Sequence, residues 1–173
     1  MVAVFKTVCE CARAYLGGFD SHTPPPFLIL DFRLLRIDVD SKGVRFLEMT
    51  ENEFKKRTKD IALRIIKLVE SLPRTWSAEV IGKQLLRSGT SIGANYRAAC
   101  RGKSVADMIH KLSIVEEEAD ECLYWMELLI DSGIISEKKL SKLYSDVDEI
   151  VAMIVSSLKT MRSRRAANPK SKI

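Results

Sequence analysis

The sequence predicts an all-α fold: an antiparallel, up-down-up-down four-helix bundle that follows a poorly defined N-terminal extension. Three observations predict it. Aromatic residues make up only 7% of the 173 residues and apolar residues 46%, which suits an aliphatic helical core. From Met49 onward, apolar residues recur at alternating spacings of three and four, as in helices that cross at a shallow angle. The connections between these repeats span roughly two to six residues, so consecutive helices run antiparallel.

Two helices are expected in the first half of this region. Residues 51–72 form the first, because Thr50 and Glu53 make a capping box and Pro73 ends the helix. Its buried stripe is Phe54, Thr58, Ile61, Ile65, Leu68 and Leu72. Residues 78–101 form the second, with Ser77 as the N-cap. Its stripe is Ile81, Leu85, Ser88, Ile92, Asn95 and Ala99.

Two further helices follow. Residues 105–132 form the third, which opens with Ser104 and Asp107 as a second capping box and ends before Gly133. Its stripe is Met108, Leu112, Val115, Ala119, Cys122, Met126 and Leu129. Residues 137–162 form the fourth, with Ser136 as its cap. Its stripe is Leu140, Leu143, Val147, Ile150, Ile154 and Met161.

Residues 1–48 differ in character from the rest. They contain three consecutive prolines and an apolar stretch at 27–39 that fits either one or two short strands or a poorly periodic helix. Because Met49 directly precedes the first cap of the bundle, we predict that translation starts there and that 1–48 are upstream sequence or a loosely attached extension. The predicted organisation is thus an extension over 1–48, a bundle over 49–162 and a basic tail over 163–173.

Several classes of protein are excluded by what the sequence lacks. No apolar run approaches the roughly 20 residues of a membrane span, and the N-terminus has no secretory signal pattern. Four scattered cysteines make no disulfide framework, which indicates a reducing, cytoplasmic location. The pairs Cys9/Cys11 and Asp107/His110 lack further ligands, so no metal and no cofactor are expected. The sequence contains no acid–base pair and no phosphate-binding loop, so we do not expect an enzyme.

The net charge of +5 is unevenly distributed. Basic and acidic groups cancel over residues 1–48 and nearly cancel over 49–158, whereas 159–173 hold six basic groups and no acidic one. A cationic tail can hold a phosphate backbone by releasing counterions. The alternative is a solvated helix end that complements the helix dipole.

Charge also separates between two neighbouring helices. The helix over 78–101 and its flanks are basic, whereas the helix over 105–132 is acidic. A basic helix can offer a cationic strip to phosphates; the alternative is ion pairing inside the bundle or between subunits, which contributes little where it is exposed. The predicted nucleic-acid-binding residues are Arg87, Arg97, Arg101, Lys103, Arg162, Arg164 and Arg165.

Ser88, Ser91 and Asn95 lie on or beside the buried stripe of the second helix, among glycines and alanines. Small side chains let a neighbouring helix approach closely, and a buried Asn can fix the register between helices. A catalytic serine would need a base, and no ordered arrangement supplies one. We therefore interpret these three as packing residues.

Some helices carry a second apolar line, for example Ala62, Ile66 and Val69 in the first helix and Val151 and Val155 in the fourth. Apolar faces wider than one bundle core requires indicate a second buried surface. We therefore predict a homo-oligomer. The alternative is a wide core that residues 1–48 cover.

The sequence also resembles a known family. The motifs are Glu70-Ser71-Leu72-Pro73, the stretch Leu86-Arg87-Ser88-Gly89-Thr90-Ser91-Ile92-Gly93-Ala94-Asn95-Tyr96, Arg101-Gly102-Lys103-Ser104, His110-Lys111-Leu112, Glu117-Glu118-Ala119-Asp120-Glu121 and Tyr124-Trp125. Over about residues 50–162 the chain resembles the bacterial four-helix-bundle proteins encoded in intervening sequences of 23S ribosomal RNA genes, the S23-like proteins. It is also similar to the accessory variability determinant of diversity-generating retroelements.

The resemblance implies a homopentamer. It further implies that Arg87, Ser88, Ser91 and Asn95 are signature residues and that Arg97 and Arg101 extend a basic side. Retroelement members bind nucleic acid and a reverse transcriptase through a positively charged surface. The leading hypothesis is therefore a non-enzymatic, oligomeric bundle that binds RNA or DNA backbones as an adaptor for a nucleic-acid enzyme. The rival hypothesis is a protein-interaction scaffold without nucleic-acid affinity.

Overall fold

The computed structural model describes residues 34–40 and 43–167, with side chains described from Met49 onward. Strands β1 (Leu34–Asp40) and β2 (Gly43–Met49) form an antiparallel two-stranded sheet in which Leu34 lies opposite Met49. The described part of the stretch 27–39 is thus a strand, which was one of the two structures that the sequence allowed. The part of that stretch before Leu34 lies outside the described residues.

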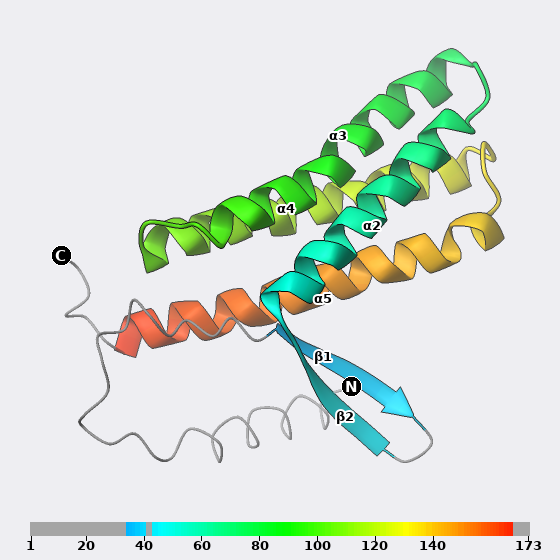
Figure 1. Cartoon of the computed structure of the whole chain (residues 1–173). Coiled ribbons are helices and arrows are strands. Elements are labelled where there is room, and N and C mark those ends of the chain that lie inside the picture. The colour runs from blue at the N-terminus through cyan, green and yellow to red at the C-terminus, as the bar shows by residue number, and fades with distance from the viewer. Residues whose placement is uncertain (1–33, 41–42, 168–173) are drawn as a thin grey trace. The chain divides into compact units, whose positions relative to one another are not determined.

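Four helices follow the hairpin: α2 (Glu51–Glu70), α3 (Trp76–Ala99), α4 (Val105–Asp131) and α5 (Glu137–Ala167). They run alternately up and down, and each packs along the next (Figure 1). Helices α2 and α5 close the ring but approach each other less closely than the other neighbouring pairs. The predicted four-helix bundle is confirmed.

The predicted cap of α2 is confirmed in both of its hydrogen bonds. The Glu53 N–H donates to Thr50 Oγ1 at 3.3 Å, and the Thr50 N–H donates to Glu53 Oε2 at 2.7 Å. The carboxylate accepts bonds from both the backbone N–H and the hydroxyl of Thr50, which lowers the pKa of Glu53. Ser104 likewise caps α4 by accepting from the Asp107 N–H at 3.1 Å. The Asp107 carboxylate, however, accepts from the Lys103 N–H at 3.0 Å and not from the N–H of Ser104. The first hydrogen bond of the predicted second capping box is therefore present, and the second one goes to the preceding residue.

Two helix ends differ from the prediction. Helix α3 begins at Trp76 and has Thr75 as its N-cap, because the Thr75 hydroxyl accepts from the Ala78 N–H at 3.4 Å; the assignment of Ser77 was wrong. Helix α5 continues to Ala167, so the first residues of the predicted tail are helical. Arginine and alanine favour helix, which explains why the last turns persist where no apolar stripe marks them.

Most positions of the predicted stripes are buried, but Leu68, Leu72, Ile81, Asn95 and Met108 are only half-buried. The core also contains Tyr96 and Leu158, which the stripes did not include. Its fully buried members include Phe54, Ile65, Leu85, Leu112 and Ile150. Much of the second apolar line is half-buried within the single chain, and four large apolar side chains are exposed among the described residues: Leu63, Trp76, Val80 and Tyr124. The predicted oligomer and the predicted start at Met49 remain predictions.

Candidate nucleic-acid interface

Ser88 lies in the core and serves packing. Its side chain is fully buried, donates to the Gln84 carbonyl at 3.1 Å and lies 3.1 Å from the Cys122 thiol. Burial raises the pKa of Cys122 to about 12. A thiol that is protonated at neutral pH is a poor nucleophile, so this pair joins α3 to α4 and offers no reactive group.

Ser91 and Asn95 are half-buried on α3. The Asn95 amide donates to the Ser91 carbonyl at 3.0 Å, one turn earlier in the same helix. This bond satisfies the amide locally rather than across an interface. Ser88, Ser91 and Asn95 therefore lie on the packed side of α3, whereas the fourth signature residue, Arg87, is exposed.

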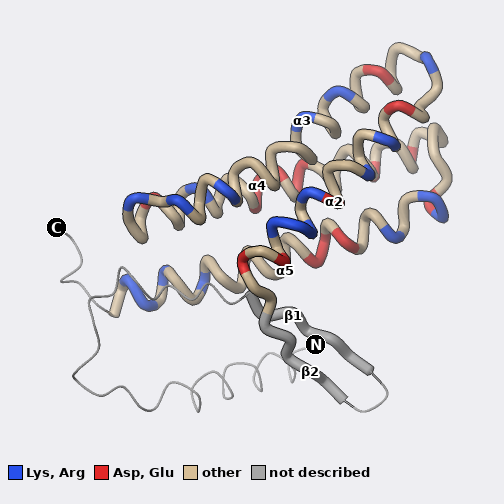
Figure 2. Tube along the Cα trace, in the orientation of Figure 1, with Lys and Arg blue, Asp and Glu red and all other residues tan. Residues whose placement is uncertain are grey.

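Six of the exposed cations gather at one end of the bundle. Helices α3 and α5 run in the same direction, so the C-terminal turns of both lie at the end where α4 begins (Figure 1). Figure 2 shows basic residues in both sets of turns. We call this the cationic end and define it by Arg97, Arg101, Lys103, Arg162, Arg164 and Arg165. All six are exposed, and the two segments that carry them, 95–103 and 160–167, contain no acidic residue.

The side chains of the cationic end are not paired with any carboxylate in the part of the chain whose side chains are described. Within residues 50–167, none of the six forms an ion pair with Asp or Glu. Arg162 donates to the Ser113 hydroxyl at 3.0 Å, which ties the end of α5 to α4. The sequence placed these residues in two separate predictions, a basic helix and a basic tail, and the fold brings both to one end.

Arg87 lies apart from the cationic end. It is exposed near the middle of α3 and pairs with Glu121 of α4, with 3.0 Å between Nη2 and Oε2. Both side chains are at least two-fifths exposed, so the pair is weak and an anion can displace it at small cost. Arg87 therefore fits both predictions that the sequence left open, phosphate binding and pairing between helices.

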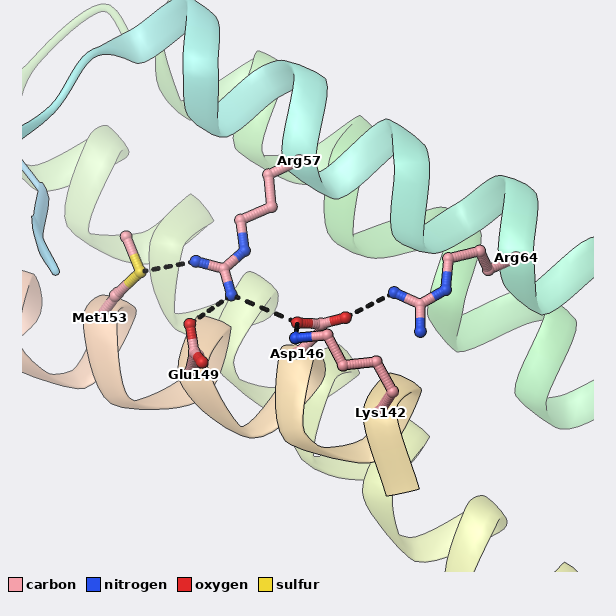
Figure 3. A network of polar contacts seen from close by, with 6 residues as sticks. All are labelled: Arg57, Arg64, Lys142, Asp146, Glu149 and Met153. Carbon is pink, nitrogen blue, oxygen red and sulfur yellow. Dashed lines mark hydrogen bonds and ion pairs between the residues drawn. The ribbon is translucent and has the colours of Figure 1, made fainter. Parts of the chain in front are cut away.

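A second charged cluster escaped the sequence analysis. Asp146 of α5 is buried to 9% exposure and receives Arg64 at 2.5 Å, Lys142 at 2.9 Å and Arg57 at 3.8 Å, while Arg57 also pairs with Glu149 at 2.5 Å (Figure 3). Burial opposes the ionisation of Asp146, but the bonds from Arg64 and Lys142 outweigh it and lower its pKa. The signal was present: Arg57 and Arg64 are seven residues apart and so share one face of α2. These cations are occupied in joining α2 to α5.

The described residues show no group of three or more metal-ligating side chains. No helix in this part of the chain is long and apolar enough to cross a membrane. Exposed His110 lies one turn after Asp107, whose carboxylate is already bonded to the Lys103 N–H and paired with Lys111 at 3.7 Å. The Arg and Lys side chains of the cationic end carry positive charge and N–H donors, and these are the groups that bind an anion.

Known proteins resemble this bundle in sequence and in structure. Residues 50–156 match the sequence profile of the 23S rRNA-intervening sequence proteins. A crystal structure of a protein of unknown function from the S23 ribosomal protein family of Bacteroides thetaiotaomicron is 40% identical, with a TM-score of 0.60; the match covers 64% of this chain and 99% of that one. No curated protein matches significantly. The profile covers more than half of the chain, including α2, α3, α4 and most of α5, and the chain therefore belongs to the 23S rRNA-intervening sequence protein family.

Proposed function

We propose that this protein is a non-enzymatic, oligomeric bundle that binds the backbone of RNA or DNA at its cationic end. The observation that carries the proposal is the convergence of six exposed basic side chains, none of them paired with a carboxylate within residues 50–167. Neutralising phosphates with Lys and Arg releases condensed counterions, and this release drives binding that is independent of sequence. Such a bundle serves as an adaptor that presents nucleic acid to an enzyme such as a reverse transcriptase.

The geometry favours backbone contacts at this end over base readout. The turns 95–103 and 160–167 contain one aromatic residue, Tyr96, and it is fully buried. Stacking on bases requires an exposed ring, so these turns supply charge alone. Arginine suits this task because its planar guanidinium binds two phosphate oxygens at once.

A paired set of charge-removing variants tests the proposal. Arg97→Ala with Arg101→Ala removes two cations from the cationic end, whereas Lys138→Ala with Lys139→Ala removes two exposed cations from the opposite end of the bundle. Affinity for a labelled oligouridine is measured by fluorescence anisotropy across a salt series. For the first variant we expect the slope of log affinity against log salt to become shallower by about 1.4, or roughly 0.7 for each lost phosphate contact.

The control variant is expected to keep the slope of the unmodified protein. Equal effects of the two double variants would contradict a localised site. The absence of salt-sensitive binding by the unmodified protein, to single-stranded and to duplex RNA alike, would remove the proposal altogether.

The second candidate function is a protein-interaction scaffold, and the Arg87–Glu121 pair favours it. That pair shows that the basic helix α3 and the acidic helix α4 are complementary, so α3 of one copy can also mate with α4 of another. The scaffold predicts that Arg87→Ala with Arg101→Ala dissociates the oligomer, whereas the nucleic-acid proposal predicts weaker binding by an intact oligomer. Light scattering on the same samples separates the two outcomes.

A further inference from the structure

An exposed line of residues runs along the whole of α3. The residues Trp76, Val80, Lys83, Arg87, Thr90, Ala94, Arg97 and Arg101 alternate at spacings of four and three, and all are exposed. This spacing keeps the seven residues up to Arg97 on one face of α3, and Arg101 lies in the turn that follows the end of the helix. At about 1.5 Å per residue the helical part of the line is roughly 32 Å long. It begins at an aromatic ring, passes two cations and ends on two members of the cationic end.

Trp76 is the large apolar side chain that the bundle leaves most open. It is 82% exposed and its neighbour on the line, Val80, is 41% exposed. By contrast, Trp125 is half-buried and packs edge-on against Tyr124, with ring centroids 5.0 Å apart. Trp76 thus adds little to the core, and its ring is available to a ligand.

The charges around Trp76 indicate the chemistry of that ligand. Exposed Arg74 precedes it, Lys83 and Arg87 follow on the same line, and Glu79 is the one acidic residue of α3. An apolar protein partner would offer no negative charge to these cations. A ligand that carries both negative charge and flat aromatic groups matches it, and nucleic acid has both.

The surroundings of the line favour one strand over two. The line is one helix wide, and α4 packs beside it with exposed carboxylates at Glu117, Asp120 and Glu127. A duplex laid along α3 with its second row of phosphates over α4 would meet those carboxylates, and like charges repel. A single strand follows the cations of α3 alone. Between Arg87 and Arg97 the line carries only Thr90 and Ala94, which leave room for a backbone to approach closely.

We propose that α3 is a binding track for single-stranded nucleic acid, with phosphates on its arginines and an unpaired base stacked on Trp76. This inference rests on the proposed function, and it adds the class of substrate and a residue that the charged end does not supply. Stacking on an aromatic side chain requires a base that is free of its partner and tolerates any sequence. The track therefore prefers single-stranded over double-stranded nucleic acid, whatever the base sequence.

The test compares Trp76→Ala, Trp76→Phe and a matched control, Tyr124→Ala, which removes a half-exposed ring from the acidic helix. Anisotropy of labelled oligouridine and of a labelled RNA duplex is measured across a salt series. We expect Trp76→Ala to weaken oligouridine binding roughly five- to 150-fold, which corresponds to the loss of one stacked base. The salt slope should stay unchanged because no phosphate contact is lost. Trp76→Phe should retain most of the affinity, and Tyr124→Ala all of it.

Four outcomes would overturn the inference. Unchanged affinity of Trp76→Ala for oligouridine, with the salt slope of the unmodified protein intact, would remove the stacking residue and leave the cationic end standing. An equal loss on the duplex would remove the selection of single strands. Dissociation of the oligomer by Trp76→Ala, with unchanged affinity, would make Trp76 a contact between copies. Absence of salt-sensitive binding by the unmodified protein would remove the proposed function as well.

Discussion

Asp146 of α5 joins this helix to α2 by pairing with two arginines of α2. These two helices approach each other less closely than the other neighbours, and Asp146 bridges them by receiving both Arg57 and Arg64. A carboxylate with only 13% of its side chain exposed must be paired, because an unpaired charge in that setting would be costly. The same carboxylate also orients the two guanidinium groups.

We expect Asp146→Asn to lower the free energy of unfolding by about 1–3 kcal/mol at neutral pH, because three cations lose a shared charge. Urea denaturation measures the change, and Asp148→Asn, an exposed acid on the same helix, is the control. The pKa of Asp146 is lowered in the folded protein, so its contribution is present above its ordinary pKa of about 3.9 and is lost as the pH falls through the lower, folded value. The difference between Asp146→Asn and the unmodified protein should therefore vanish in strong acid; a difference that persists there would contradict the charge-based explanation.

Gly89 is a second residue with a specific role. A Cβ atom at this position would lie 2.3 Å from Ile65 Cδ1 and 3.2 Å from Ile65 Cγ2, and Ile65 is fully buried. At Gly93, by contrast, the nearest atom would be Thr58 Oγ1 at 3.4 Å. The small residues of α3 thus let α2 approach most closely around Gly89.

This contrast predicts opposite signs for two glycine substitutions. Gly89→Ala should destabilise the bundle by about 1 kcal/mol or more. Overpacking costs about 1–3 kcal/mol, whereas the higher helix propensity of alanine stabilises the helix by less than about 1 kcal/mol. Gly93→Ala should be neutral or stabilising by up to about 1 kcal/mol, since its new methyl group fits. Thermal unfolding of both variants measures the difference. Equal effects would show that close packing does not explain Gly89.

At the scale of elements, the sequence predicted the existence and order of all four helices because each has a strong apolar period. Their ends were less predictable. Thr75 and Ser77 both have the side chain of a helix cap, and the choice between them depends on the turn after Pro73, which no local pattern determines. The last turns of α5 were missed because an exposed helix end such as Arg164–Ala167 has no apolar stripe.

The start of α3 provides a direct test of these assignments. We expect Thr75→Ala to lower the free energy of unfolding by about 1 kcal/mol, because the Ala78 N–H loses its acceptor. Ser77→Ala lies inside the first turn and should change stability little. Chemical denaturation compares them. A larger loss for Ser77→Ala would mean that the helix begins two residues later.

At the scale of the whole molecule, the sequence predicted the individual residues of the candidate site but not that they lie together. Arg97 and Arg162 were both predicted to bind nucleic acid, yet they are 65 residues apart in the chain, and only the parallel directions of α3 and α5 bring their turns to one end. The same fold pairs other cations with carboxylates, so that they are not available to a nucleic acid. Arg57 and Arg64 are basic residues of similar sequence context, and the network around Asp146 occupies both.

Arginine footprinting tests the central claim most directly. Phenylglyoxal modifies accessible guanidinium groups, and mass spectrometry of the digested protein reports the extent of modification at each one with and without oligouridine. We predict that the nucleic acid protects Arg97, Arg101 and Arg162, whereas the modification of Arg64, which faces Asp146, does not change. Protection of Arg64 to the same extent, or no protection at the cationic end under conditions where the RNA is bound, would contradict this account.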